Sequence, residues 1–160
     1  MKNITLFALA LAVLTSCSTR LQSRLDDRLR QMEAGITTQN PAQIAAIYSD
    51  DSHVIAPHKI DAQGREAVDD YWQRLGDMAS DWRLESFVVS RNLEDILEST
   101  TWQELERKPR LPEALDIPLP AGELIYQLGR SHLTFERNGQ ENTSVVTFLL
   151  IWKKVEGEYQ

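Results

Sequence analysis

The dipeptide Asn138-Gly139 is the feature that most constrains the fold of this 160-residue chain. Asn-Gly favours a type I′ turn, and here it lies between two strand-like runs, about Leu124–Arg137 and Gln140–Lys154. The dipeptide therefore predicts a long antiparallel hairpin. Within the second run, Val145–Trp152 is almost wholly apolar, which indicates a central strand covered on both faces.

The spacing of apolar residues changes from a helical period to a strand period near residue 80. Before that point, steps of three and four predict amphipathic helices, the second beginning at Asn40-Pro41 and the third after Gly64. After it, the period of two predicts a strand with one face formed by Trp82, Leu84, Ser86 and Val88 and the other by Arg83, Glu85, Phe87 and Val89. Helices followed by antiparallel strands are typical of an α+β fold.

The segment of about residues 96–120 breaks this pattern. It contains four of the six prolines, at positions 109, 112, 118 and 120. Long irregular stretches inside a domain are either functional lids or plain insertions. We favour an irregular insertion with one helical turn at Trp102–Arg107.

The N-terminal segment has the composition of a secretory signal. Lys2 precedes an apolar run, Ile4–Leu14, of about 11 residues, whereas a membrane-spanning helix needs roughly 20. The run ends in Leu14-Thr15-Ser16-Cys17, which resembles a bacterial lipobox and contains the only cysteine. The resemblance implies cleavage before Cys17 and lipidation of its sulfur, and two or three acyl chains form a stable anchor.

These features divide the chain into a lipoprotein signal peptide at residues 1–16, a lipidated polar tether at 17–22 and a single domain at 23–160. Lipoproteins of this type that stay in the inner membrane commonly carry Asp after the cysteine, and here that position is Ser18. We therefore expect a lipid-anchored protein at the outer membrane, facing the periplasm.

Charge and titratable side chains exclude several classes of function. Without Lys2, 16 basic and 24 acidic side chains give a formal charge of −8, and no basic run favours a nucleic acid partner. His53, His58 and His132 have no recognisable metal-ligand spacing, so we expect no metal and no cofactor. Acid–base catalysis by His53 or His132 with a nearby carboxylate remains an alternative.

Several short motifs resemble a known superfamily. They are Ile44–Asp51, Val54–Pro57 and Gly64–Val68 with Tyr71-Trp72, and later Tyr126–Gly129 and Leu150–Lys154. Together they resemble the cone-shaped superfamily named after nuclear transport factor two, in the branch of ketosteroid isomerase and the SnoaL-like cyclases. The resemblance implies N-terminal helices packed in a curved mixed or antiparallel sheet.

The comparison with ketosteroid isomerase also bears on activity. Its proton-abstracting Asp corresponds to Ala56, its oxyanion-hole Tyr to Met32, and its second oxyanion donor to a position near Leu150. Apolar residues supply neither a base nor an oxyanion donor, so this chemistry is disfavoured. The resemblance instead implies a mostly apolar pocket, or a filled core, formed by Met32, Val54, Ala56, Tyr71 and Leu150.

We therefore expect a domain that binds a small apolar molecule or a partner protein without catalysis. The alternative is a SnoaL-like or isomerase-type enzyme that uses a non-standard acid–base residue. A third interpretation is a structural homodimer that pairs through an exposed apolar sheet face, for which the candidates are Trp82, Phe135 and Trp152.

Overall fold

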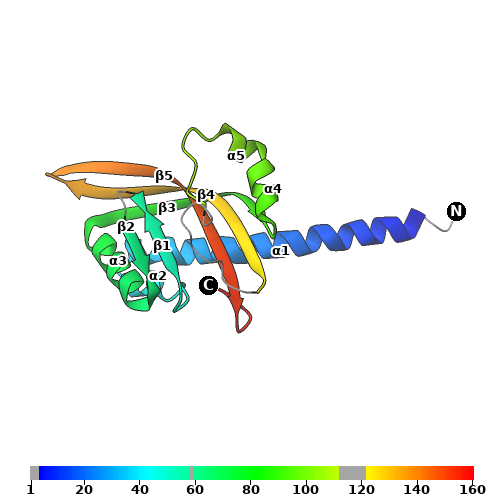
Figure 1. The fold of residues 1–160 in the computed structure, drawn as a ribbon, viewed down its shortest axis with the longest axis horizontal. Coiled ribbons are helices and arrows are strands. Elements are labelled where there is room, and N and C mark those ends of the chain that lie inside the picture. The colour runs from blue at the N-terminus through cyan, green and yellow to red at the C-terminus, as the bar shows by residue number, and fades with distance from the viewer. Residues whose placement is uncertain (1–3, 58–59, 112–121) are drawn as a thin grey trace.

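A long N-terminal helix lies against the concave face of a curled antiparallel sheet (Figure 1). The structure is a computed structural model, and it describes residues 4–57, 60–111 and 122–160. The helices are α1 (Ile4–Thr37), α2 (Pro41–Ala45), α3 (Gly64–Met78), α4 (Leu93–Glu98) and α5 (Thr100–Glu104). The strands are β1 (His53–Ala56), β2 (Ile60–Gln63), β3 (Ala79–Ser90), β4 (Leu124–Arg137), β5 (Gln140–Val155) and β6 (Glu158–Tyr159).

The strands form a four-stranded sheet in the order β3-β4-β5-β6 and a separate β1–β2 hairpin. The predicted hairpin is confirmed: β4 and β5 pair antiparallel from Arg137–Gln140 to Leu124–Lys153. At the turn, Asn138 and Gly139 have φ angles of 55° and 72°, as a type I′ turn requires. The α+β fold with helices packed in a curved antiparallel sheet is therefore observed.

A β-bulge in β3 corrects the predicted faces of this strand. Ser86 pairs with Gly129 and Val88 pairs with Leu128, so one extra residue, Phe87, lies between them on β3. The extra residue reverses the alternation. Val88 consequently packs on the convex face of the sheet, and Val89 packs on the concave face instead. The prediction was correct for the residues before the bulge and wrong for these two valines.

The main core lies between α1 and the concave face. The helical spacing predicts an apolar stripe of Leu21, Leu25, Leu29, Met32 and Ile36. The last four are each at most 3% exposed, and Leu21 is partly buried against the core. Each such side chain contributes roughly 1.5–3 kcal/mol of hydrophobic stabilisation relative to an exposed one. The stripe packs in one cluster with buried side chains from α3 and the sheet, namely Val68, Trp72, Trp82, Ile125 and Trp152.

A second, smaller core covers part of the convex face. Ile96 of α4 and Trp102 of α5 pack against Tyr126 and Leu128 of β4. Ser99 stabilises the start of α5 because its side chain accepts a hydrogen bond from the backbone N–H of Trp102. The first part of the predicted irregular insertion is thus a packed helical cap, and residues 112–121 of that prediction lie outside the described residues.

The two tryptophans proposed for an exposed sheet face are in the core. Trp82 is 7% exposed and Trp152 is 4% exposed, and each indole N–H donates a hydrogen bond inside the protein. Only Phe135, opposite Ala79 near the end of β4, is partly exposed. The predicted apolar face was therefore wrong for these tryptophans, while homodimer formation itself stays a prediction.

Helix α1 is continuous from Ile4 to Thr37, so its backbone is helical through residues 17–22, where the sequence suggested a polar tether. Among the residues that the structure describes, no helix is both long and apolar enough to span a bilayer. The predicted division at Cys17 therefore falls within a helix rather than at a loop.

Charged side chains fix the segment between α2 and α3. Arg65 donates hydrogen bonds to the backbone carbonyls of Ala45, the last residue of α2, and of Tyr48, and its Nε lies 3.0 Å from Asp50. Asp51 accepts hydrogen bonds from Lys153 of β5 and from Ser49, and these lower the pKa of its carboxyl group. Asp50 and Asp51 thus have scaffold roles.

We expect Gly129→Ala to destabilise the fold severely. A Cβ at this position would overlap the carbonyl oxygen of Glu85 and the ring of Phe148, so the sheet would have to shift at the bulge. Overpacking of this kind lowers the free energy of unfolding by about 3 kcal/mol. Urea denaturation measures the loss, and Gly76→Ala, whose Cβ would lie in tight contact 3.0 Å from the Pro41 side chain, serves as the milder control. Equal stability of the two variants would contradict the packing.

Candidate functional site

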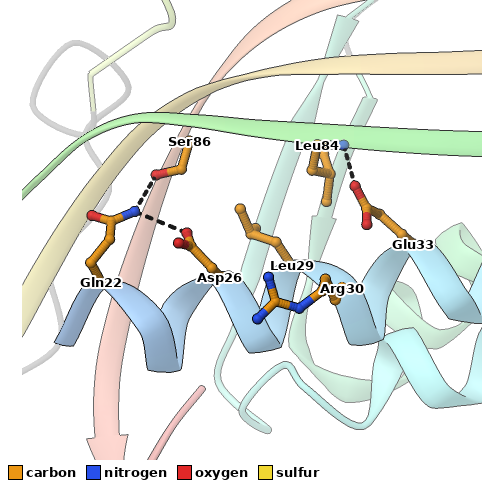
Figure 2. Close-up of a pocket in the computed structure, with 7 residues that line it drawn as sticks. All are labelled: Gln22, Asp26, Leu29, Arg30, Glu33, Leu84 and Ser86. Atoms are coloured by element: carbon orange, nitrogen blue, oxygen red, sulfur yellow. Dashed lines mark hydrogen bonds between the residues drawn. The ribbon is translucent and has the colours of Figure 1, made fainter. Parts of the chain in front are cut away.

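A small polar hollow lies between α1 and β3 (Figure 2). Its volume is about 190 Å³. Five of its lining residues come from α1 and two from β3: Gln22, Asp26, Leu29, Arg30, Glu33, Leu84 and Ser86. Polar and charged side chains dominate this lining, in contrast to the apolar core beside it.

The α1 residues reach the hollow because of their spacing. Gln22, Asp26, Arg30 and Glu33 are separated by steps of four, four and three, so they lie along one face of the helix. This polar row runs beside the buried apolar stripe. A single helix thereby supplies both the core contact and the polar wall.

Glu33 also closes the free edge of the sheet. Strand β3 is the first strand in the order β3-β4-β5-β6, so one side of its backbone has no partner strand. The backbone N–H of Leu84 on that side donates to Glu33 Oε1 at 2.6 Å. An edge covered in this way is a poor template for pairing with another chain.

A chain of hydrogen bonds connects the hollow to the buried core. Trp152 Nε1 donates to Gln127 Oε1 at 2.9 Å, and Gln127 Nε2 donates to Ser86 Oγ at 3.0 Å. Gln127 is fully buried. Because an indole nitrogen only donates, the Gln127 amide must turn its oxygen to Trp152 and its NH₂ group to Ser86.

The Ser86 hydroxyl group consequently keeps its O–H proton available as a hydrogen-bond donor. Its oxygen accepts from Gln127 and also from Gln22 Nε2, again at 3.0 Å. Two accepted hydrogen bonds occupy both lone pairs. Within the described residues, the Ser86 O–H proton has no acceptor, so a bound molecule can accept it.

The carboxylates of the hollow keep accepting capacity as well. Asp26 Oδ1 accepts from Gln22 Nε2 at 2.9 Å, and Glu33 Oε1 accepts from Leu84. Within the described part of the chain, Asp26 Oδ2 and Glu33 Oε2 accept no hydrogen bond. Arg30 pairs with Asp27 outside the hollow. The wall thus presents two negative charges to one positive charge, and that cation is already paired.

The five residues predicted to form a pocket lie elsewhere. Met32 is 2% exposed in the core, and Val54, Tyr71 and Leu150 pack against that core. Ala56 is partly buried at the end of β1. None of the five lines the hollow beside α1. Their role in binding a ligand stays a prediction.

Aromatic rings occupy the region around these residues. The ring of Trp72 lies 4.9 Å from Tyr71, 5.6 Å from Tyr48 and 5.1 Å from Trp82, measured between centroids. Burial raises the pKa of both tyrosine hydroxyls, and their mutual proximity raises that of Tyr48 further. These phenols therefore stay neutral and act as packing groups.

The histidines considered for acid–base catalysis also lie outside the hollow. His53 pairs with Asp61 across the β1–β2 hairpin, and His132 Nε2 lies 3.8 Å from Glu85. In the ranges that the structure describes, His, Cys, Asp and Glu form no group of three or more suited to a metal ion. The titratable groups of the site are thus Asp26, Arg30 and Glu33.

The sequence matches no protein-family model and no curated protein sequence. Solved structures do match the arrangement of α1 in the curled sheet. A ketosteroid isomerase-like protein from Erwinia carotovora atroseptica superposes with a TM-score of 0.58 at 12% identity, covering 86% of this chain and 88% of that protein. The chain has the cone fold of nuclear transport factor two.

Other proteins with the cone fold differ in activity. A hexachlorocyclohexane dehydrochlorinase has a TM-score of 0.57 at 9% identity, covering 89% of this chain and 81% of the enzyme. A protein of unknown function from Mycobacterium tuberculosis has a TM-score of 0.60 at 11% identity, covering 91% and 70%. Similarity at this level establishes the fold and leaves activity to the site.

We expect Gln127→Leu to lower stability by about 2 kcal/mol, because the Trp152 N–H would lose its acceptor in the core. Gln140→Leu, at an exposed position on β5, is the matched control and should change stability by less than about 0.5 kcal/mol. Urea unfolding checks both values. A loss no larger than that of the control would show that the Gln127 hydrogen bonds are not formed.

Proposed function

We propose that this protein is a lipid-anchored domain of the bacterial cell envelope that binds a small hydrophilic molecule in the hollow beside α1 without transforming it. The observation that carries the proposal is the pre-set hydroxyl of Ser86. Two amide donors fix it as an acceptor, so that its proton is directed away from them. Pre-organised polar groups in a concave site favour binding because few side chains lose conformational entropy when the ligand binds.

The lining favours a particular kind of ligand. It offers one hydroxyl donor, from Ser86, and carboxylate acceptors, from Asp26 and Glu33. A matching molecule carries an oxygen acceptor close to ammonium or hydroxyl donors. The volume of about 190 Å³ corresponds to roughly six water molecules at about 30 Å³ each. This lining favours a hydrophilic ligand over the apolar ligand that the sequence suggested.

Acid–base catalysis is the second candidate function. Its support is the Asp26 carboxylate, which lies in the hollow beside the Ser86 hydroxyl and could act as a general base. The cone fold also occurs in the dehydrochlorinase named above. Against it, the positions that resemble the ketosteroid isomerase base and oxyanion donors carry Ala56, Met32 and Leu150. Conversion of a bound molecule, abolished in Asp26→Asn, would decide for the enzyme.

The anchor and the hollow would be close together. The lipobox resemblance places the lipid on Cys17, and Ser18 favours the outer membrane with the domain in the periplasm. Gln22 follows Cys17 by five positions of the helix, a rise of about 7.5 Å. The proposal therefore places the binding hollow next to the membrane surface, where a ligand would be met close to the lipid headgroups.

We expect Asp26→Asn and Ser86→Ala each to weaken ligand binding about tenfold, because each removes a charged or hydroxyl partner from the hollow. The probes are ethanolamine and glycerol, titrated while the side-chain amide NMR signals of Gln22 and Gln127 are followed. Asp81→Asn and Ser80→Ala, both at exposed positions on β3 outside the hollow, are the controls. Shifts of the two amide signals that are equal in all four variants would refute the site.

We expect the wild-type protein in a bacterial host to incorporate an alkyne-labelled fatty acid and to sediment with membranes, and Cys17→Ser to do neither. Ser16→Ala, directly before the cleavage position, keeps both the cysteine and a small residue and is the control. Labelled fatty acid on Cys17→Ser, or membrane sedimentation of that variant to the same extent as the wild type, would contradict the anchor.

A further inference from the structure

A second hollow lies on the other side of β3, beneath the helical cap. Its volume is about 500 Å³, within the usual range of roughly 300–1,000 Å³ for small-molecule sites. It is lined by Ser86 and Phe87 of β3, by Arg130 of β4, and by Thr101, Glu104 and Leu105 at α5. Apart from Ser86, it shares no lining residue with the hollow beside α1.

Arg130 is the charged group of this second hollow. Its side chain is partly buried, and the guanidinium carbon lies 5.2 Å from the ring centroid of Phe87. Glu85, directly across from it on β3, forms its salt bridge with Arg83 at 2.8 Å instead. In the described part of the chain, Arg130 has no carboxylate within 4.0 Å. A guanidinium held against a ring keeps its planar set of donors for a bidentate anion.

Two side chains give the second hollow, whose lining is otherwise polar or charged, an apolar part. Phe87 is the extra residue of the β-bulge, and it is 36% exposed. Leu105 supplies apolar surface from the other side. Helix α5 is fixed to the sheet because Trp102 packs into the second core. The hollow is thus pre-formed, with an apolar surface next to an unpaired cation.

We propose that this hollow binds a small organic carboxylate with an apolar body. The carboxylate accepts two parallel hydrogen bonds from Arg130, and the Thr101 hydroxyl lies in the same lining to donate a third. The apolar body rests against Phe87 and Leu105. Glu104, exposed at the rim, carries the same charge as the ligand and therefore weakens its binding.

The test uses the full mature protein in nanodiscs and 4-fluorobenzoate as the probe, followed by ¹⁹F NMR with empty nanodiscs subtracted. We expect Arg130→Gln to weaken binding by roughly 10-fold or more, since a charged hydrogen-bonding partner is lost. Arg130→Lys keeps the positive charge but loses the planar pair of guanidinium donors. Its affinity for the probe should lie between those of the wild type and Arg130→Gln. Arg137→Gln, at an exposed position on the same strand, should bind like the wild type.

Glu104→Gln provides a test of opposite sign. Removing this negative charge should tighten 4-fluorobenzoate binding about two- to threefold. Two further probes, 4-fluorobenzyl alcohol without the charge and fluoroacetate without the apolar body, should each bind at least 10-fold more weakly. Glu94→Gln, at an exposed position on α4 outside both hollows, should leave 4-fluorobenzoate binding unchanged.

The proposal is overturned by any of three results. They are wild-type affinity in Arg130→Gln, equal binding of the alcohol and the acid, and weaker binding in Glu104→Gln. The last result would show that Glu104 does not repel the bound carboxylate. A urea midpoint for Arg130→Gln within the error of that for Arg137→Gln establishes that lost binding does not reflect lost folding.

Discussion

The extra residue at Phe87 determines which face of the sheet the following residues of β3 occupy. Before the bulge, Trp82, Leu84 and Ser86 face α1. After it, Val88 faces the cap and Val89 faces the core. Without the bulge, Val88 would follow Ser86 on the concave face and strict alternation would place Val89 on the convex one. The bulge therefore determines which of the two cores each valine enters.

Gly129 explains why the sheet accepts this departure. It pairs with Ser86, and the ring of Phe148 and the carbonyl of Glu85 approach it where a side chain would otherwise lie. A glycine in a strand commonly marks such a bulge or close backbone approach. The absence of a side chain at Gly129 leaves room for neighbouring groups to converge at the bulge. Close packing, rather than a turn conformation, therefore requires glycine at position 129.

The indole N–H groups of Trp82 and Trp152 are satisfied inside the core, whereas that of Trp72 has no hydrogen-bond partner within the described residues. The indole N–H groups of Trp82 and Trp152 donate to Ser131 and Gln127, and Gln127 donates onward to Ser86. A buried donor without an acceptor would cost roughly 1–3 kcal/mol. These acceptors allow the two tryptophans to be buried without that cost. Because the partners lie about 25 and 49 positions away, the sequence alone did not reveal them.

The sequence predicted the elements that local patterns specify. Asn138-Gly139 determines its own turn, and the stripe from Leu25 to Ile36 determines which face of α1 is buried. The bulge left no such signal, since alternation holds on each side of it. The polar row from Gln22 to Glu33 was present as a helical spacing, yet it becomes a site only because β3, some 50 residues later, lies beside it. Non-local contact, rather than residue type, separates what was predicted from what was not.

Helix α1 links these features to the proposed anchor. Its apolar stripe binds the sheet, its polar row lines the hollow, and its N-terminal continuation carries Cys17. A lipid on Cys17 would therefore attach to the same rigid element that forms the binding wall, with no loop between them. A helix transmits orientation, whereas a flexible polar tether of the same length would not. Under the proposed function, the anchor consequently sets the direction in which the hollow faces the membrane, as well as its distance.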